Sequence, residues 1–457
     1  MAKDPRLSTH AVIMGGGEGS RLYILTKHRS KPAVATNGNL RIIDFVLTNI
    51  GETPDISDLL ILTQYEKTSL DNHIGHGSIW GFGDERRLTV CSPSQEGRRV
   101  RDKSYHIKEY EGTADAVRKS MPRINSKELP LVLILGGDHA YRTDYNELLQ
   151  QHVDSSADLT IMANVVPEEN ISSLGIMKID KDKSIVDFYE KPESPELVKD
   201  FSLDLETVIS LKLDPSKKYY LASMGNYVFD REKLNEFLKD DEREDFGKHI
   251  IPGLKESGKR LIAYIYPEYW ADIGKISDYF EFNMAYAAGN GPINLGEKVV
   301  RTYLRNLPMA TITDSDVKFA QLSPGDRIES SQLRLVIAGY QVIVDSGSEI
   351  DHSLLLGADR NTSSNRYSSI VRSSKLSKVV LDKNVWVEGC DLGPHNGDPE
   401  EREAKLIKSG LEPYSVNDEG MITGDFYIDK ETGILCIRKQ REIDSDKKRP
   451  FLYNITA

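Results

Sequence analysis

A glycine-rich segment near the N-terminus runs directly into a group of basic side chains. It reads GGGEGSRLYILTKHRSK, so that Gly16, Gly17 and Gly19 are followed by Arg21 and then by Lys31. Backbone N–H groups of glycines can approach a phosphate closely, an arginine can donate two parallel hydrogen bonds to it, and a lysine adds a point charge. We therefore expect this segment to bind a phosphorylated ligand.

Two common phosphate-binding patterns do not fit the segment. A Walker A motif places Lys before Ser or Thr after its last glycine, whereas Ser20 and Arg21 stand there. The dinucleotide fingerprint expects a third glycine or alanine where Ser20 lies. The alternatives are a tight turn for the glycines and a solvated basic turn for Arg29, Ser30 and Lys31.

Two aspartates follow apolar segments. In LVLILGGDHAY an apolar run and two glycines lead to Asp138, and Mg²⁺ needs only one or two carboxylates besides substrate oxygens and water. Asp138 is therefore a candidate Mg²⁺ ligand, with a helix cap as the alternative, and His139 is expected to pack or to cap. Asp272 in PEYWADIGK is by itself typical of a turn or a helix cap.

A carboxylate and an ammonium group stand side by side in the segment DFYEKP. Glu190 could accept hydrogen bonds from sugar hydroxyls, and Lys191 could pair with a phosphate on the same sugar. The alternative is a surface ion pair, which contributes little to stability.

Short apolar runs recur from Ala11 to about Phe280, separated by helix-length segments. The runs are AVIM, DLLILT, LPLVLILGG, ADLTIMANVV, YLASMGNYVF and RLIAYIYP. Runs of this length rich in Val, Ile and Leu predict an α/β fold with a mainly parallel sheet buried on both faces. Such sheets bind ligands at the carboxyl ends of their strands, where the segments with Arg21 and Asp138 are expected to lie.

The periodicity changes after residue 338. Apolar residues then recur six positions apart, in the sets Val344, Ile350 and Leu356, then Ile370 and Leu376, then Leu381 and Val387. This spacing is typical of hexapeptide β-helix turns, with irregular β-structure as the alternative. Residues 281–338 contain turn signals such as QLSPGDRIESS, and we interpret them as a linker.

The length, the net charge and the cysteine positions restrict the class of protein. A chain of 457 residues is too long for one typical core, so we expect two domains. Its net charge of -12 argues against a general role in binding nucleic acid or membrane surfaces. The three cysteines, Cys91, Cys390 and Cys436, are too far apart for a disulfide framework or a zinc site, and no secretory signal is recognisable, which together predict a cytoplasmic location.

Taken together, these segments resemble the ADP-glucose pyrophosphorylases, or glucose-1-phosphate adenylyltransferases, of bacteria and plants. The segments that carry the resemblance are GGGEGSRL, RSKPAV, LRIIDFVLTN, LTQY, EGTADAV, GGDHAY, EKP, ASMGNYVF, DFGKHIIP and YWADIGK, in family order. The resemblance implies a Rossmann-like catalytic domain over residues 1–280, the linker over 281–338, and a left-handed β-helix over 339–457 for regulation and oligomerisation. It also implies a homotetramer.

The resemblance further implies a reaction and a set of site residues. ATP and glucose 1-phosphate would give ADP-glucose and pyrophosphate, with Mg²⁺ as cofactor and glycogen synthesis as the purpose. The catalytic residues would be Arg21, Lys31 and Asp138, and Mg²⁺ would be held by Asp138 and Asp272. The nucleotide would be bound by Gly16, Gly17, Gly19, Gln64, Gly112 and Thr113. The sugar phosphate would be bound by Glu190, Lys191, Ser223, Asp245 and Phe246.

Several positions bear on regulation by a small-molecule effector, for which the resemblance assigns His28, Arg29 and Lys439. His28 stands where the family has a lysine, so that a response to an effector would depend on pH. Ile24 replaces a common proline, and Glu111 stands where some bacterial members have arginine.

Two other functions fit the same residues. A non-catalytic regulatory subunit would bind the ligands, but such subunits alter the loop arginine or the following lysine, and Arg21, Lys31 and Asp138 are all present. A related transferase would use UTP or dTTP, but the segment LRIIDFVLTN and the C-terminal domain favour ATP.

Overall fold

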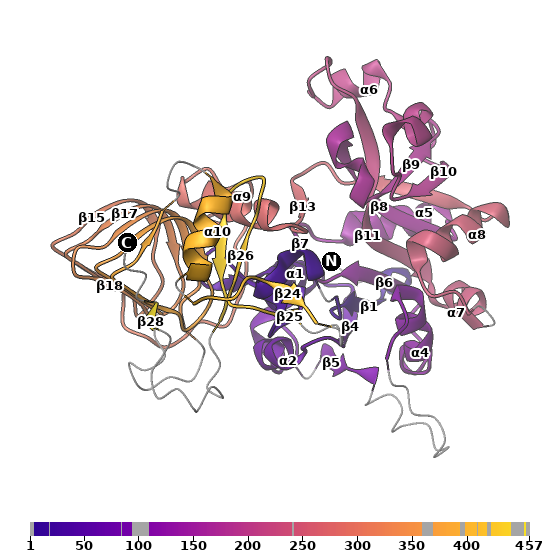
Figure 1. Ribbon diagram of the computed structural model, residues 1–457. Helices are drawn as coiled ribbons and strands as arrows, with labels where there is room; N and C mark the ends of the chain where they lie inside the picture. The colour runs from indigo at the N-terminus through magenta and orange to yellow at the C-terminus, as the bar shows by residue number, and fades with distance from the viewer. Residues whose placement is uncertain are drawn as a thin grey trace. The chain divides into compact units, whose positions relative to one another are not determined.

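The computed structural model describes residues 4–17, 19–83, 85–93, 109–239, 242–358, 369–393, 398–408, 410–417, 422–439 and 452–453. The chain forms two compact units (Figure 1). Unit 1 comprises Met1–Gly16, Phe45–Gln64 and Ile74–Ala271, and unit 2 comprises Gly17–Asp44, Tyr65–His73 and Asp272–Ala457. The division therefore falls inside the glycine-rich segment, whose basic part belongs to the same unit as the C-terminal region.

Unit 1 is built on a sheet that is parallel at its centre. The strands β1 (Thr9–Met14), β4 (Ile56–Leu62), β5 (Arg87–Cys91) and β6 (Leu131–Gly136) run parallel in the order β6-β1-β4-β5. The side chains of β1, β4 and β6 are almost all buried. Strands covered on both faces need apolar residues at successive positions, which is what the runs AVIM and LVLIL supply.

Antiparallel strands extend this sheet beyond β6. They are β8 (Leu159–Pro167), β9 (Gly175–Ile179), β10 (Ile185–Glu190), β11 (Tyr219–Asp230) and β12 (Leu261–Ile265), of which β12 is parallel to β8. Strand β11 pairs with β6, β8 and β9, and its register shifts between Ser223 and Asn226, where Gly225 has φ +69°. All six apolar runs of the sequence are thus strands of one sheet, which confirms the predicted α/β fold.

Helices cover the sheet of unit 1 and complete its core. They are α4 (Thr113–Asn125), α5 (Asn146–Ser155), α7 (Arg231–Lys239) and α8 (Ile251–Glu256). The short helix α6 (Leu205–Ser210) also belongs to unit 1, and the residues of α1 (Ile42–Glu52) and α2 (Thr68–Ile74) are divided between the two units. Apolar side chains of α4, α7 and α8 pack in one cluster with those of β1, β4, β6, β8, β11 and β12. No helix in the described ranges is long and apolar enough to cross a membrane.

Unit 2 contains two stacks of parallel strands that form a β-helix-like fold. One stack is β14 (Thr311–Thr313), β16 (Arg327–Glu329), β18 (Val342–Asp345), β20 (Ser369–Arg372), β22 (Trp386–Glu388) and β28 (Leu452–Tyr453). The other is β15 (Asp316–Gln321), β17 (Gln332–Ala338), β19 (Glu349–Leu355), β21 (Lys375–Leu381) and β27 (Leu435–Ile437), with β26 (Phe426–Ile428) antiparallel to β27 and β23 (Asp391–Leu392) beside β21. The coil strands alternate between the stacks along the chain, as expected for successive coils.

The bends of the coils are marked by positive backbone angles. Leu335, His352 and Lys378 have φ of 52°, 42° and 53° and lie at equivalent positions of β17, β19 and β21. Positive φ is uncommon for such residues, so its repetition in register indicates a regular corner. Ile350 and Leu355 belong to the core cluster of the coils, and Leu356, expected from the six-residue spacing, is buried as well.

The predicted domain limits need correction. The first coil strand begins at Thr311, so residues 311–338 of the expected linker belong to the β-helix-like stack. Helix α9 (Ile276–Ala287) crosses the expected limit at residue 280 and lies against β15, β17 and β19. Local turn signals such as SPGD therefore marked the corners of a coil rather than an unstructured connection.

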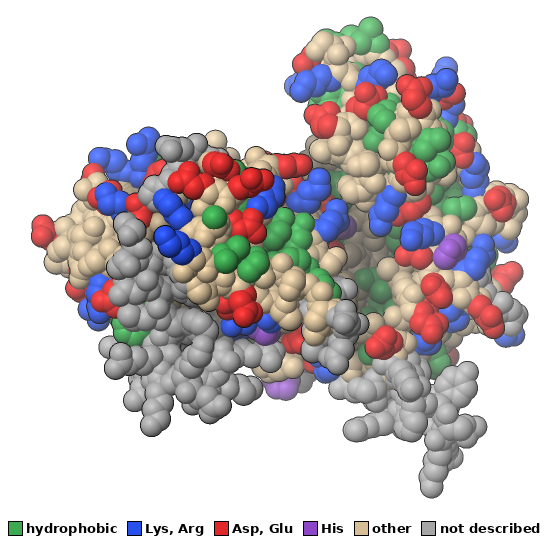
Figure 2. All heavy atoms as spheres, in the orientation of Figure 1, with side chains coloured by type: hydrophobic (Ala, Val, Ile, Leu, Met, Phe, Trp, Pro, Cys, Tyr) green, Lys and Arg blue, Asp and Glu red, His purple; other side chains and the backbone are tan. Residues whose placement is uncertain are grey.

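Acidic and basic side chains are interspersed over the visible face of the molecule (Figure 2).

His10 provides a test of this core at low pH. It is 1% exposed in β1, neither ring nitrogen has a hydrogen-bond partner among the described residues, and its Nδ1 lies 3.8 Å from Asp58 Oδ1. Burial lowers the pKa of His10 to about 4. The unfolded chain, with a histidine pKa near 6.5, then binds more protons than the folded chain between pH 6.5 and 4, so stability falls as the pH falls. His10→Asn should reduce the loss of unfolding free energy between pH 7 and pH 5 by about 2 kcal/mol.

Chemical denaturation at the two pH values measures this loss. The exposed His76, replaced by Asn, is the control and should leave the loss unchanged. An equal loss in wild type and His10→Asn would show that His10 is not buried in its neutral form.

Candidate functional site

The glycine-rich segment is shaped around Lys31. Gly19 has φ +67°, and a Cβ atom there would lie 2.7 Å from the Cβ of Lys31. The Lys31 N–H donates to the Gly17 carbonyl at 3.3 Å, and the Thr26 hydroxyl donates to the Gly19 carbonyl at 3.1 Å. Gly19 is therefore required both for its backbone conformation and for the close approach of the lysine.

The basic residues that follow are buried rather than solvated. Arg29, Ser30 and Lys31 are 2%, 0% and 5% exposed, which excludes a solvated basic turn. Lys31 Nζ lies 2.6 Å from Asp272 Oδ1, and the Arg29 guanidinium bonds both oxygens of Asp382 at 2.8 and 3.0 Å. Buried charges need such partners because burial removes their hydration.

Arg21 also lies near Asp272. A Cβ atom on Gly274 would be 3.0 Å from Arg21 Nη2 and 3.5 Å from Asp272 Oδ2, so the glycine leaves room for the guanidinium close to the carboxylate. The alternative of a helix cap for Asp272 is wrong, because α9 begins at Ile276 with Lys275 as its cap. One carboxylate between an ammonium and a guanidinium leaves the local charge positive, which suits a polyphosphate.

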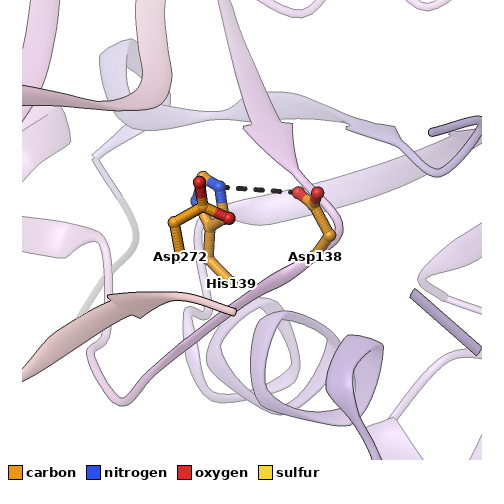
Figure 3. Close-up of side chains that lie close together, drawn as sticks. All are labelled: Asp138, His139 and Asp272. Carbon is orange, nitrogen blue, oxygen red and sulfur yellow. Dashed lines mark ion pairs between the residues drawn. The ribbon is translucent and has the colours of Figure 1, made fainter. Parts of the chain in front are cut away.

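Asp138, His139 and Asp272 converge at a small two-stranded sheet (Figure 3). The sheet pairs β7 (His139–Tyr141) with β13 (Trp270–Asp272), and the division between the two units falls after Ala271, within β13. One ligand atom of each of the three side chains lies within 4.8 Å of the others, and His139 Nε2 is 3.5 Å from Asp138 Oδ1. Asp138 precedes a strand, so it is not a helix cap.

The donor set of this group fits a magnesium ion. Mg²⁺ prefers oxygen ligands and keeps several waters and substrate oxygens, so two half-exposed carboxylates suffice. The imidazole of His139 is a ligand that Mn²⁺ or Zn²⁺ would also accept. Sequence reasoning expected His139 only to pack, and it does pack edge-on against Trp270 with ring centroids 5.4 Å apart.

A second group of side chains surrounds Glu190 at the end of β10. A Cβ atom on Gly175 or Gly247 would lie 2.6 or 2.5 Å from Glu190 Oε2, so both glycines are needed for the carboxylate to fit. Its side chain is 19% exposed, and burial raises the pKa of Glu190. Lys191 Nζ lies 3.8 Å from Glu190 Oε1, but it is 56% exposed and remains accessible to solutes.

Tyr227 is the residue that sequence reasoning missed in this group. Its hydroxyl hydrogen-bonds Ser223, and its ring centroid is 5.4 Å from that of Phe246. Burial raises its pKa, and the charges of Glu190 and Asp245 act in the same direction. The signal was present in ASMGNYVF, because a tyrosine inside a buried strand needs a partner for its hydroxyl.

Thr113, which was expected to contact the nucleotide, is hydrogen-bonded to two residues that were expected at the sugar phosphate. Thr113 begins α4, and its hydroxyl donates to Asp245 Oδ2 at 3.2 Å and accepts from the Phe246 N–H at 3.1 Å. Gly112 packs against the carbonyl of Glu244, which leaves no room for a side chain. The structure therefore brings Thr113 together with Asp245 and Phe246, which were expected at the sugar phosphate.

Gln64, at the end of β4, has its amide engaged by the backbone. Its Oε1 accepts from the Tyr110 N–H at 2.6 Å, and its Nε2 donates to the Tyr110 carbonyl at 3.3 Å. A Cβ atom on Gly16 would lie 3.2 Å from the Cβ of Gln64, so the glycine allows the strand end to approach the loop. Gln64 thus positions Tyr110 besides any contact that it makes to a ligand.

The three residues expected at an effector site differ in accessibility. The expectation that Arg29 is accessible to an effector needs correction. Its guanidinium is buried in an ion pair with Asp382, which makes Arg29 a structural link in this conformation. His28 and Lys439 are half-buried. Arg438, which precedes Lys439 in the sequence, pairs with Asp425 at 2.8 Å.

Comparison with known proteins identifies the family of the chain. Residues 10–289 match the nucleotidyl transferase family. The chain is 32% identical over 428 residues to the glucose-1-phosphate adenylyltransferase small subunit, chloroplastic/amyloplastic, of Triticum aestivum, and the match covers 88% of each chain. Coverage and identity at this level show that the chain belongs to the nucleotidyl transferase family, in the branch of the glucose-1-phosphate adenylyltransferases, or ADP-glucose pyrophosphorylases.

Proposed function

We propose that this chain is a catalytic glucose-1-phosphate adenylyltransferase that converts ATP and glucose 1-phosphate into ADP-glucose and pyrophosphate. The observation that carries the proposal is that Lys31 pairs with Asp272 and that the Arg21 guanidinium lies near the same carboxylate. A chain that only bound ligands for regulation would not need two cations and a carboxylate held this closely.

In the proposed reaction a phosphate oxygen of glucose 1-phosphate attacks the α-phosphorus of ATP. The new oxygen–phosphorus bond forms as the bond from the α-phosphorus to the bridging oxygen breaks, and pyrophosphate leaves with that oxygen. No covalent bond to the protein is needed, so catalysis is positioning and charge stabilisation. Arg21 would stabilise the leaving pyrophosphate, Lys31 would lie beside it, and the N–H groups of Gly16, Gly17 and Gly19 would face the triphosphate.

Asp138 and Asp272 would hold Mg²⁺, and the ion would neutralise the charge of the phosphates. Asp272 would then face both the metal and the Lys31 ammonium. The charge-assisted hydrogen bond from the Lys31 ammonium to Asp272 Oδ1 would hold this carboxylate in place before the metal binds.

Glucose 1-phosphate would lie at the second group of side chains. Glu190 would accept hydrogen bonds from glucose hydroxyls and Lys191 would pair with the sugar phosphate, with Ser223, Asp245 and Phe246 completing the pocket. Tyr227 supports this assignment, because it lies beside Ser223 and Phe246 and feels the charges of Glu190 and Asp245. Gln64, Gly112 and Thr113 would lie at the adenosine.

Further proposals rest on the resemblance alone. They are a homotetramer, a small-molecule effector acting through His28 and Lys439, a cytoplasmic location and a role in glycogen synthesis. The left-handed sense of the β-helix is proposed on the same basis. The relative from Triticum aestivum is named as a small subunit, so the rival proposal of a regulatory subunit is tested together with catalysis.

Pyrophosphate release tests the function and the nucleotide preference. With Mg²⁺ and glucose 1-phosphate, ATP should support release, and UTP and dTTP should be poorer substrates. Asp138→Asn should lower kcat by about 1000-fold or more, because it removes one of the metal-facing carboxylates. The control Asp180→Asn, in an exposed turn of unit 1, should be as active as wild type.

The outcomes separate the rival functions. No release with any nucleotide, together with intact ligand binding, would favour a regulatory subunit. Faster release with UTP or dTTP would assign a different base preference.

Gly247→Ala tests the proposed glucose position. The added methyl group would lie 2.5 Å from Glu190 Oε2 and must displace the carboxylate. The KM for glucose 1-phosphate should rise by about tenfold or more while the KM for ATP changes little, since a misplaced carboxylate affects the sugar alone. In the control Gly83→Ala, the added atom meets nothing within 4 Å. An equal rise of both KM values would argue against a role for Glu190 in sugar binding.

The substitution Lys31→Met tests, by metal binding instead of activity, whether Asp272 faces both the lysine and the metal. If the Lys31 ammonium neutralises Asp272 in the free protein, its removal should strengthen the binding of Mn²⁺ in the absence of nucleotide by about tenfold. Electron paramagnetic resonance of free Mn²⁺ measures the affinity. The control is Lys67→Met, which removes a more exposed ion pair with Asp71 of α2. Unchanged or weaker binding in Lys31→Met would show that the lysine does not compete with the metal.

A further inference from the structure

Tyr23 has a strained backbone inside the loop that carries Arg21. Its φ of 50° and ψ of -124° interrupt the short helical segment η2 (Ser20–Thr26). A non-glycine residue in a sparsely populated region costs about 1–3 kcal/mol and persists only when its surroundings hold it there. The contacts of its side chain show what holds it.

The ring of Tyr23 is packed between two tyrosines of the C-terminal region. It stacks on Tyr427 with centroids 3.7 Å apart and planes inclined by 14°, and it meets Tyr414 edge-on at 5.0 Å and 86°. Tyr414 and Tyr427 also meet edge-on at 5.9 Å. An edge-on pair such as that with Tyr414 contributes about 0.5–1.5 kcal/mol beyond the area that it buries, and the close stack on Tyr427 adds dispersion contacts, so the two together act against strain of this size.

The two C-terminal tyrosines are themselves fixed by backbone pairing. The Tyr414 N–H donates to the Phe426 carbonyl at 2.7 Å, and the Asp425 N–H donates to the Glu412 carbonyl at 2.7 Å. Between them β24 (Ser415–Val416) pairs with β25 (Ile422–Thr423). Elements β25, β26 and β27 all contact η2. The C-terminal clamp, defined as Glu412–Val416 and Ile422–Ile428, thus lies against the loop.

The position of Tyr23 is transmitted to Arg21 through a short closed turn. The Thr26 hydroxyl donates to the carbonyls of both Gly19 and Tyr23, at 3.1 and 3.0 Å, so the two ends of the Arg21 segment are tied together. Arg21 is exposed and packs against Gly274, with no ion pair or hydrogen bond of its own recorded among the described residues. Its direction therefore depends on the backbone of the turn.

We infer that Tyr23, held by Tyr427 and Tyr414 of the C-terminal clamp, is a positioning residue that aims the Arg21 guanidinium at the pyrophosphate group. The inference deepens the proposed function and rests on its assignment of Arg21 to pyrophosphate. It makes the C-terminal clamp a part of the active-site support, because the strained turn has no other aromatic partner in the described chain.

Substitutions at Tyr427 test this role. Tyr427→Ala should lower kcat by about tenfold with the KM for glucose 1-phosphate within about twofold of wild type, since the ring supports a group that acts on the leaving pyrophosphate. Tyr427→Phe keeps the stacked ring and should restore the wild-type rate. Phe319→Ala, which removes an exposed ring from β15 of the same unit, is the control.

A double-mutant cycle identifies Arg21 as the group affected. In an Arg21→Ala background, Tyr427→Ala should cause no further loss of kcat, because two residues that act through one contact are not additive. Calorimetric binding of inorganic pyrophosphate with Mg²⁺ provides a second readout, in which Tyr427→Ala should bind about tenfold more weakly than Tyr427→Phe.

The outcomes distinguish the inference from the proposed function. Additive losses in the cycle, a wild-type rate in Tyr427→Ala, or equal pyrophosphate affinity in the Ala and Phe variants would overturn the positioning role. An inactive wild type would contradict the proposed function. The comparison of pyrophosphate affinity between Tyr427→Ala and Tyr427→Phe would then decide the positioning role by itself. Tyr427→Leu, which keeps an apolar side chain without a flat ring, replaces the Ala variant if that variant unfolds.

Discussion

The pairing of Lys31 with Asp272 is the interaction on which the arrangement of the phosphate-binding side chains depends. It forms only because Gly19 adopts a positive φ and leaves room for the lysine. The same carboxylate lies close to the Arg21 guanidinium across Gly274. A buried ammonium group without this partner would carry a large desolvation cost. The burial of Lys31 therefore depends both on the Asp272 carboxylate and on the backbone conformation of Gly19.

The glycine-rich loop is held by the C-terminal unit as much as by its own sequence. Arg29 forms a buried ion pair with Asp382, next to the last long coil strand, and the ring of Tyr23 lies against Tyr427. These contacts explain why residues 17–44 group with the β-helix-like region rather than with the sheet that they follow. The β-helix-like region therefore supports the active-site loop directly.

The second group of side chains follows a different physical rule. Glu190 is kept in a partly buried place by two glycines, and Tyr227 gives Ser223 a hydrogen-bonding partner inside the sheet. Burial of a carboxylate raises its pKa and strengthens its hydrogen bonds to neutral hydroxyls, which suits recognition of a sugar. The bulge at Gly225 in β11 lies next to Ser223 and interrupts the regular pairing there.

The sequence by itself determined the strands, the α/β class and the residue types of the site. Apolar runs, and glycines followed by charged residues, are local patterns that can be read without the tertiary structure. The tertiary structure decided the rest. It placed residues 311–338 in the coils, buried Arg29 against Asp382, and brought Tyr427 onto Tyr23. The last two choices join residues that are hundreds of positions apart, and the free energy that selects them comes from packing and desolvation, which no local spacing records.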